Sequence, residues 1–434
     1  MSRRDSLIQS MRHGVLGHVL VLMSWTALAQ VVSIGMMFLL PRLFTPGQFG
    51  VFSVFSGLVV AIGIVAAARY EFAIGLPASQ REGAALFTLC VGMSGLVAAA
   101  CLVAFRLLPS SSGLLAKFSG VHAWRDWAAI GIACMAWYNA AGYLALRSGS
   151  FAAVGKSKVV IAVVTAAGQL MSVAVVDRAE GWLIVPFVAG QACGVLVILY
   201  GLWDEQIWNL RLADISAVAR RFVRFPLMIA PGSLLDGIAV FLPVALLTAM
   251  FSPRDAGIYA LAERALRVPI TFVGSSVLQV LYKKLADLRG DPAAGRRFLL
   301  RTWLVLGSVG LLPCIVIAMY GDTLFSLVFG DRWQESGKVA RILVISMFFL
   351  FVSYPASNIL VVHERARSFL LWQVVQIMFV GGALGLAAAI GGTSIEATVA
   401  ILVAGQLLVY LFSMYLQWTA VSDRTVAGRE LAAP

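Results

Sequence analysis

Long apolar stretches alternate with short polar connections along the whole chain. Each stretch is close to 20 residues, the length that a helix needs to cross a hydrocarbon core of about 30 Å. Segments such as "SGLVVAIGIVAAA" at 56–68 do not alternate apolar and polar positions as a membrane β-strand does. The pattern predicts about twelve transmembrane helices, at 15–40, 49–68, 84–108, 127–146, 159–176, 182–203, 226–250, 257–281, 299–320, 339–362, 369–390 and 397–418.

The composition agrees with this pattern. Hydrophobic residues make up 60% of the 434 residues and charged residues 12%, with a mean hydropathy of +0.90. A soluble globular chain has roughly a quarter charged residues, so this chain has too few to cover a surface that faces water. We therefore expect an all-α integral membrane protein.

The basic residues are unevenly distributed between the two sets of connections. Most Lys and Arg residues fall on the side that carries the N-terminus. Because an excess of Lys and Arg marks the cytoplasmic side, we expect both termini in the cytoplasm. Basic loops that face anionic lipid also explain the net charge of +12, so nucleic acid is not an expected partner.

One ten-residue motif, which we call the corner, occurs twice in the sequence. "LFTPGQFGVF" at 43–52 returns as "MFSPRDAGIY" at 250–259. In each copy a Ser or Thr precedes a Pro, which is the chemistry of a helix start: the hydroxyl caps free backbone N–H groups and Pro loses no hydrogen bond. A glycine follows in both, Gly50 and Gly257, and predicts a close approach to a neighbouring helix.

Two further markers repeat in the same order. "VAGQ" at 188–191 returns at 403–406, and "RSGSF" at 147–151 returns as "RARSF" at 365–369, each about 210 residues later. The halves are therefore predicted to be two parallel six-helix bundles, related by a pseudo-two-fold axis normal to the membrane, with a cavity between them. The expected domains are residues 1–203 and 226–420, joined by a cytoplasmic linker at 204–225 and followed by a cytoplasmic tail at 421–434.

Three segments resemble a known family. They are "PRLFTPGQFGVFSVFSGLVVAIGIVAAARYEFAIGLP" at 41–77, "GIYALAERALRVPITFVGSSVLQVLYKKLADL" at 257–288 and "YPASNILVVHERARSF" at 354–369. They are similar to the Wzx-type polysaccharide and O-antigen flippases of the multidrug/oligosaccharidyl-lipid/polysaccharide exporter superfamily. His363-Glu364 departs from that pattern, where a smaller turn is expected.

The resemblance implies a location and a function. The chain would be a multi-pass protein of the bacterial cytoplasmic (inner) membrane. It would move a polyprenyl-pyrophosphate-linked oligosaccharide from the inner to the outer leaflet by alternating access, for lipopolysaccharide O-antigen or exopolysaccharide synthesis. Its partners would be this lipid-linked substrate, membrane lipids and other polysaccharide assembly proteins, and it would act as a monomer.

The eighth predicted helix carries the richest candidate site. A polar stripe covers about 120° of its surface at helical spacing; its members are Glu263, Arg264, Arg267, Thr271, Gly274, Ser275 and Tyr282. We expect Arg264 and Arg267 to bind the substrate phosphates. The equivalent positions of the first half are uncharged, which favours a functional role. Two alternatives stay open: the arginines reach the lipid headgroups, or Arg267 only pairs with Glu263 four residues earlier.

Two further sets of ionisable residues stand out. Asp236, in the seventh predicted helix, and Glu263 are candidates for binding a coupling ion or for forming a structural ion pair. Arg69 and Glu71 close the second predicted helix on the cytoplasmic side. Either they form a local ion pair, or they line the cytoplasmic entrance for the substrate.

The tenth predicted helix has a polar face suited to sugar hydroxyls. Ser353, Tyr354, Ser357 and Asn358 lie on it, together with Ser346. Hydrogen bonding between helices explains such residues equally well. The repeated Gln191 and Gln406 are expected to serve packing.

No catalytic or cofactor motif is found. The four histidines and five cysteines lack metal-ligand spacing, so no metal, no cofactor and no enzymatic activity are expected, with a proton or a sodium ion left open as the coupling ion. A cation-coupled drug or metabolite antiporter of the same superfamily is the first alternative. A membrane polysaccharide polymerase or ligase is another, but its catalytic loop would not fit the short outer segments 109–126 and 321–338. A purely structural membrane protein is the last.

Overall fold

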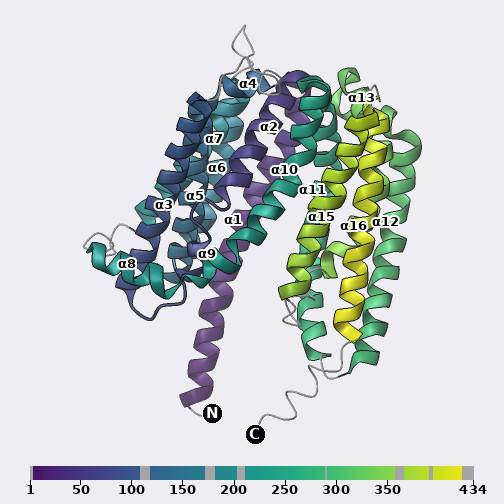
Figure 1. The fold of residues 1–434 in the computed structure, drawn as a ribbon. Coiled ribbons are helices and arrows are strands. Elements are labelled where there is room, and N and C mark those ends of the chain that lie inside the picture. Colours follow the sequence, from purple (N-terminus) through teal and green to yellow (C-terminus); the bar gives the residue numbers. More distant parts are fainter. Residues whose placement is uncertain are drawn as a thin grey trace. The chain divides into compact units, whose positions relative to one another are not determined.

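The computed structural model describes residues 3–107, 118–171, 181–202, 211–288, 291–356, 366–390 and 394–422. Every regular element within these ranges is a helix, which confirms the all-α class (Figure 1). The contacts divide the chain into two units: Met1–Phe44 with Val51–Gly237, and Thr45–Gly50 with Ile238–Pro434. The expected domain boundaries stay a prediction.

The first unit is a bundle of long helices. It contains α1 (Arg3–Leu43), most of α2 (Pro46–Gly63), η1 (Tyr70–Ala73), α3 (Gln80–Leu107), α4 (Ser119–His122), α5 (Arg125–Arg147), α6 (Phe151–Met171), α7 (Gly181–Gly201), α8 (Leu212–Arg221), α9 (Arg224–Met228) and the start of α10 (Ala230–Met250). Helix α5 packs between α3 and α7, and α6 packs between α1 and α7. Many of the buried positions are alanines, which lets these helices approach closely.

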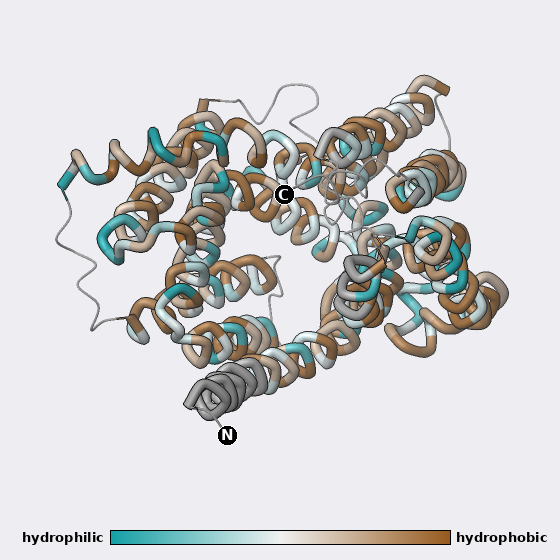
Figure 2. The backbone as a smooth tube through the Cα atoms, turned by 90° about the horizontal axis from the view of Figure 1, so that it is seen from below, coloured by the Kyte–Doolittle hydropathy of each residue, from teal (hydrophilic) through white to brown (hydrophobic). Residues whose placement is uncertain are grey.

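The second unit is built around α13. It contains α11 (Pro253–Asp287), α12 (Pro292–Phe329), η4 (Asp331–Trp333), α13 (Gln334–Ser353), η5 (Tyr354–Ala356), α15 (Ala366–Ile390) and α16 (Ile395–Ser422). Helix α13 contacts α11, α12 and α16, and α15 packs against α16. Apolar residues predominate along the membrane-length helices, with hydrophilic stretches between them (Figure 2).

The twelve predicted helices each overlap a helix of the structure. Eleven helices in the described ranges are long and apolar enough to cross a membrane. Helix α11, with 35 residues, is also long enough but carries more charge. The chain is therefore a multi-pass membrane protein.

The two copies of the repeated corner begin with the same cap. Thr45 Oγ1 accepts a hydrogen bond from the backbone N–H of Gln48 at 3.4 Å, and Gln48 Oε1 accepts one from the N–H of Thr45 at 2.8 Å. In the second copy, Ser252 Oγ accepts from the N–H of Asp255 at 3.3 Å and donates to Asp255 Oδ2 at 2.6 Å. Both helix starts are capped as predicted.

The glycines of the two corners lie against each other within the second unit. A Cβ placed on Gly50 would lie 1.7 Å from the carbonyl oxygen of Pro253, and one on Gly257 would lie 1.8 Å from the carbonyl oxygen of Pro46. The contact is reciprocal, since each glycine faces the first residue of the other helix. The close approach predicted for both glycines is confirmed, and only glycine fits at this spacing.

Two predicted helix ends are wrong. Helix α2 ends at Gly63 and not at residue 68. Beyond it the N–H of Val65 donates to the carbonyl of Ile62 and that of Ala68 to the carbonyl of Val65, so the bonds of an α-helix are replaced by turns. Ala68 and Arg69 then have positive φ values of 48° and 61°. Helix α13 ends at Ser353, where the chain tightens into η5 before Pro355. Residues 357–362, which we expected to continue this helix, lie outside the described ranges.

Candidate functional site

Helix α11 holds most of the predicted site. It continues through Pro269, which lacks the N–H group of an ordinary helix residue. One turn after the charged residues, the Thr271 hydroxyl donates to the backbone carbonyl of Arg267 at 3.1 Å. Such a bond satisfies the hydroxyl within its own helix, so Thr271 is held locally.

Arg267 and Glu263 form an ion pair. The Nε of Arg267 donates to Glu263 Oε1, and the two side chains are 34% and 21% exposed. Residues four apart lie on the same face of a helix, so the pairing follows from the sequence spacing. The alternative of an i,i+4 pair is therefore realised in the structure, while phosphate binding by Arg267 stays a prediction.

Two tyrosines surround this ion pair. Tyr259 is 2% exposed and Tyr410, on α16, is half-buried. Both interact electrostatically with Glu263 and Arg267, and the Tyr410 hydroxyl is within hydrogen-bonding reach of Arg267. Tyr410 was not among the residues predicted from the sequence. Its only signal is that it follows Gln406 by four residues, which places both on one face of α16.

Arg264 differs from Arg267 in its surroundings. Its side chain is exposed, and within the described ranges it makes no hydrogen bond and no ion pair. A guanidinium keeps its charge at any physiological pH and is costly to leave in hydrocarbon. Arg264 therefore needs water or an anion as its partner, and its exposed guanidinium is available to a ligand.

Asp236 lies on α10 with an exposed side chain. It belongs to the first unit, whereas Arg264 and Arg267 belong to the second. Its expected role in binding a coupling ion, or in pairing with an arginine of α11, stays a prediction.

Of the predicted sugar-binding residues, Ser353 and Tyr354 lie in the described ranges and Ser357 and Asn358 do not. Ser353 is 3% exposed, and its backbone carbonyl accepts a hydrogen bond from Gln417 Nε2 at 3.1 Å. Tyr354 packs over Gly274 of α11, where an added Cβ would come within 2.5 Å of the ring. Tyr354 is thus beside the polar stripe of α11, while Ser353 belongs to the helix packing.

Ser346 forms a buried hydrogen bond between helices. Its hydroxyl lies 2.8 Å from Gln406 Oε1 on α16, and the two residues are 0% and 6% exposed. Interhelical hydrogen bonding, the second reading of this polar face, is therefore confirmed for Ser346. The packing role expected of Gln406 is also confirmed.

Replacing Ser346 with alanine is expected to lower the stability of the protein without changing its binding of substrate. The change leaves the buried amide oxygen of Gln406 without this donor, which costs about 1–3 kcal/mol. The thermal unfolding of the purified variant in detergent measures this effect, with the exposed Ser308→Ala on α12 as a control. Unchanged unfolding in Ser346→Ala would contradict the role of the hydrogen bond.

Arg69 and Glu71 form the expected local ion pair. Arg69 Nη1 lies 3.2 Å from Glu71 Oε1, and the guanidinium stacks over the Phe72 ring at 4.9 Å. Glu71 is 2% exposed, and its second oxygen, Oε2, lacks a hydrogen-bond partner among the described residues, as does Arg69 Nε. The pair is thus buried and only half satisfied. A role at the substrate entrance stays a prediction.

The stability of the protein is expected to depend on the charge of Glu71. Burial raises the pKa of this carboxyl, against the opposing effects of a backbone hydrogen bond and of Arg69. The folded protein then binds this proton more tightly than the unfolded chain does. The contribution of Glu71 to stability is therefore greatest at low pH and falls as the pH rises from about 4.3, the usual value, through the folded-state pKa. Glu71→Gln mimics the protonated form and should keep its stability over this range.

The measurement is the melting temperature of both proteins across pH. The gap in favour of Glu71→Gln should widen as the pH rises, and Glu82→Gln, which removes a more exposed carboxylate in the same unit, should show no such trend. A gap that is the same at every pH would mean that Glu71 ionises as easily in the folded protein as in the unfolded chain.

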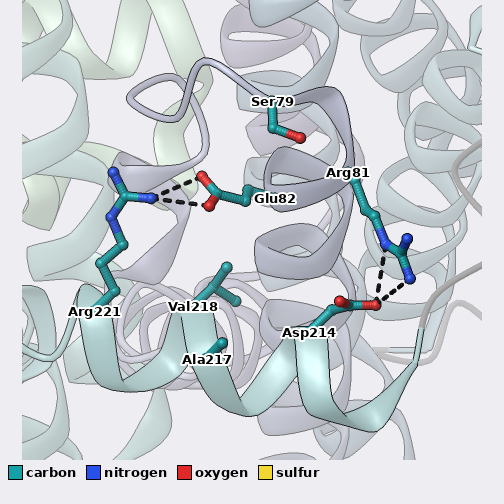
Figure 3. A pocket seen from close by; sticks show the side chains of 7 residues that line it. All are labelled: Ser79, Arg81, Glu82, Asp214, Ala217, Val218 and Arg221. Atoms are coloured by element: carbon teal, nitrogen blue, oxygen red, sulfur yellow. Dashed lines mark hydrogen bonds and ion pairs between the residues drawn. The ribbon is translucent and has the colours of Figure 1, made fainter.

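The expected linker contains a docked helix. Helix α8 lies across the end of α3 (Figure 1, Figure 3), where Arg81 Nη2 lies 2.7 Å from Asp214 Oδ2 and Arg221 Nη1 lies 2.9 Å from Glu82 Oε1. The Tyr70 hydroxyl donates to the carbonyl of Ala219 at 2.9 Å. This docking was not predicted, although the pattern of Ile215, Val218 and the arginines after them indicates an amphipathic helix.

The arrangement can bind a ligand through charge and hydroxyl contacts. It offers the exposed guanidinium of Arg264 on α11 and the ring of Tyr354 beside the same helix. Within the described ranges, no group of three or more His, Cys, Asp or Glu residues could hold a metal ion.

Three comparisons place the chain among known proteins. A family model described as "Polysaccharide biosynthesis protein" matches residues 39–338. No curated protein matches the chain. Among solved structures, a lipid II flippase MurJ in an inward closed conformation has a TM-score of 0.71 at 9% identity, with 94% of this chain and 90% of that chain covered.

Two other solved structures share the fold at a lower score. A multidrug resistance MATE family transporter of the MOP superfamily, in an inward-facing conformation, has a TM-score of 0.58 at 13% identity, with 94% and 95% of the chains covered. A point mutant of the Vibrio cholerae MATE transporter VcmN has a TM-score of 0.57 at 14% identity, with 95% and 97% covered. At these identities the likeness establishes the fold alone.

The family match covers more than half of the chain, and the fold is that of flippases and transporters of the multidrug/oligosaccharidyl-lipid/polysaccharide exporter superfamily. The resemblance found in the sequence is therefore confirmed, and the chain belongs to the polysaccharide biosynthesis protein family.

Proposed function

We propose that this protein moves a polyprenyl-pyrophosphate-linked oligosaccharide from the inner to the outer leaflet of the cytoplasmic membrane by alternating access. The match to the polysaccharide biosynthesis family over residues 39–338 carries this proposal. Polysaccharides are assembled from sugars on a lipid carrier, and the charged headgroup of that carrier cannot cross hydrocarbon unaided because each bare charge and unsatisfied hydroxyl is costly there.

The residues of α11 support the proposal. Arg264 presents an exposed guanidinium without a partner in the described ranges, which suits a phosphate. Gly274 lies ten residues further along α11, or about 15 Å at 1.5 Å per residue, and Tyr354 packs on it. We assign the phosphate to Arg264, with Arg267 nearby, and a sugar ring to Tyr354.

The remaining parts of the proposal rest on sequence. The excess of Lys and Arg in one set of connections supports cytoplasmic termini. No catalytic step is needed, since translocation makes and breaks no covalent bond. A proton or sodium gradient, coupled through Asp236 or Glu263, is compatible with the charges present, and the protein is proposed to act as a monomer.

Deletion of the gene tests this function. Lipid-linked oligosaccharide should accumulate in the inner leaflet and surface polysaccharide should be lost, and expression of the intact chain should restore both. A deletion strain with normal surface polysaccharide but increased sensitivity to toxic small molecules would instead indicate the antiporter alternative.

A further inference from the structure

A polar cavity lies between α3 and α8 in the first unit. It has a volume of about 300 Å³ and is lined by Ser79, Arg81, Glu82, Asp214, Ala217, Val218 and Arg221 (Figure 3). The pair of Arg221 and Glu82 stands at one side of the cavity, and the pair of Arg81 and Asp214 stands at the other. Val218 and Ala217 of α8 lie between the two pairs (Figure 3). None of these residues belongs to α11, to which we assign the transported substrate.

We propose that this cavity binds the headgroup of a phospholipid that carries both a phosphate and a primary ammonium, as an ethanolamine headgroup does. The phosphate would lie against Arg221 at one side of the cavity, and the ammonium against Asp214 at the other. This binding does not depend on the transport function.

The charges of the cavity favour a zwitterion over an anion. Its four ionisable side chains form two pairs, so their charges sum to zero. An anionic headgroup would face two carboxylates as well as two arginines, and its attraction and repulsion would nearly cancel. A phosphate and an ammonium on one headgroup can satisfy both signs, and a primary ammonium donates hydrogen bonds to carboxylates that a choline group cannot.

The existing ion pairs do not block such a ligand. The side chains of Arg81 and Arg221 are 53% and 59% exposed, and those of Asp214 and Glu82 are 30% and 36% exposed. Exposed pairs of this kind contribute little to stability, so they can exchange partners at small cost. Asp214 keeps its charge, because the backbone N–H of Arg211 and then the Arg81 side chain lower its pKa.

The position of the cavity favours a lipid over a free solute. It lies at the end of α3, a membrane-crossing helix that begins at Gln80, and therefore at the level of the headgroups. Exposed apolar side chains flank its lining in sequence: Leu76 is 62% exposed, three residues before Ser79, and Val223 is 43% exposed, two residues after Arg221. Acyl chains would cover these side chains, whereas a soluble molecule would leave them in water.

Lipid-dependent thermal unfolding of the full chain tests the proposal. The protein, purified and delipidated in detergent, is titrated with phosphatidylethanolamine, phosphatidylcholine, phosphatidylglycerol or soluble phosphoethanolamine. Phosphatidylethanolamine is expected to raise the melting temperature by a few degrees more than the other three do. Equal shifts with all three lipids, or a larger shift with phosphatidylglycerol, would overturn the proposal, and an equal shift with phosphoethanolamine would show that the acyl chains are not recognised.

Two variants locate the binding. Ala217→Trp fills the cavity with an indole while leaving both ion pairs in place, and Glu82→Gln with Arg221→Gln removes one pair without changing the net charge. Each should abolish the selective shift with phosphatidylethanolamine. The matched control is Arg106→Gln with Asp126→Asn, which removes an exposed 3.0 Å pair of the same unit and should keep the shift. A shift that persists in Ala217→Trp would place the lipid elsewhere.

Discussion

Replacing Gly50 with alanine is expected to destabilise the protein severely. The new methyl group would lie 1.7 Å from the carbonyl oxygen of Pro253 and 2.6 Å from its carbonyl carbon, and both atoms belong to backbone that no rotamer change can move. Overpacking in a well-packed core costs about 1–3 kcal/mol when side chains can adjust, and here the obstacle is the start of α11 itself. Gly257→Ala should behave alike, because its methyl group would meet the carbonyl oxygen of Pro46 at 1.8 Å.

Gly47 provides the control for this prediction. It lies in the same turn as Gly50, but a Cβ added to it meets no atom within 4 Å. Gly47→Ala should therefore leave the protein as stable as before or slightly more so, since alanine favours a helix by about 1 kcal/mol over glycine. The yield of monodisperse protein and its melting temperature measure both effects. Equal behaviour of Gly47→Ala and Gly50→Ala would contradict the close contact of the two corners.

Arg264→Ala is expected to weaken substrate binding alone, whereas Arg267→Ala is expected to lower stability as well. Arg264 makes no hydrogen bond or ion pair within the described ranges, so its loss should leave the melting temperature unchanged but weaken the binding of substrate. A charge-assisted hydrogen bond contributes about 1.5–3 kcal/mol, which corresponds to at least a tenfold loss of affinity. Arg267→Ala removes the partner of the half-buried Glu263 and should lower the melting temperature as well.

Complementation of the deletion strain, together with thermal unfolding, measures the two effects. Arg254→Ala is the matched control: it removes an equal charge from the first turn of α11, where the arginine forms an exposed pair with Glu335 at 2.8 Å. This control should retain both activity and stability. Full activity of the Arg264→Ala, Arg267→Ala double variant would remove the phosphate role assigned to α11.

The framework of the fold could be predicted from the sequence because it depends on local rules. The length of each apolar run sets a membrane-crossing helix, and Thr45-Pro46 and Ser252-Pro253 set two helix starts by capping. The repeated glycine predicted a close approach between helices, and the structure shows that the two glycine-containing helix starts contact each other. The end of α2 could not be predicted, because "AAARY" is a good helical sequence, whereas in the structure the chain turns at Ala68 and Arg69 and Tyr70 and Glu71 after the turn are buried.

The candidate site could be predicted only in part, because helical spacing gives direction and not neighbours. Spacing placed Glu263, Arg264 and Arg267 on one face of α11, but it could not show that Glu263 pairs with the second arginine and leaves the first exposed. Tyr410 and the bond from Ser346 to Gln406 involve residues more than 50 positions apart in the chain. Contacts of this kind depend on which helices pack together, and a single sequence does not contain that information.

Reconstitution of the purified protein tests the proposed transport most directly. Vesicles are prepared with a polyprenyl-pyrophosphate-linked oligosaccharide in both leaflets, and a membrane-impermeant sugar-modifying enzyme then acts on the outer leaflet only. Vesicles without protein should expose about half of the lipid, and vesicles with the intact chain should expose nearly all of it over time. Arg254→Ala should match the intact chain, and Arg264→Ala should be much slower. Exposure that stays at one half with the intact chain, under an imposed proton gradient and under a sodium gradient, would contradict the account.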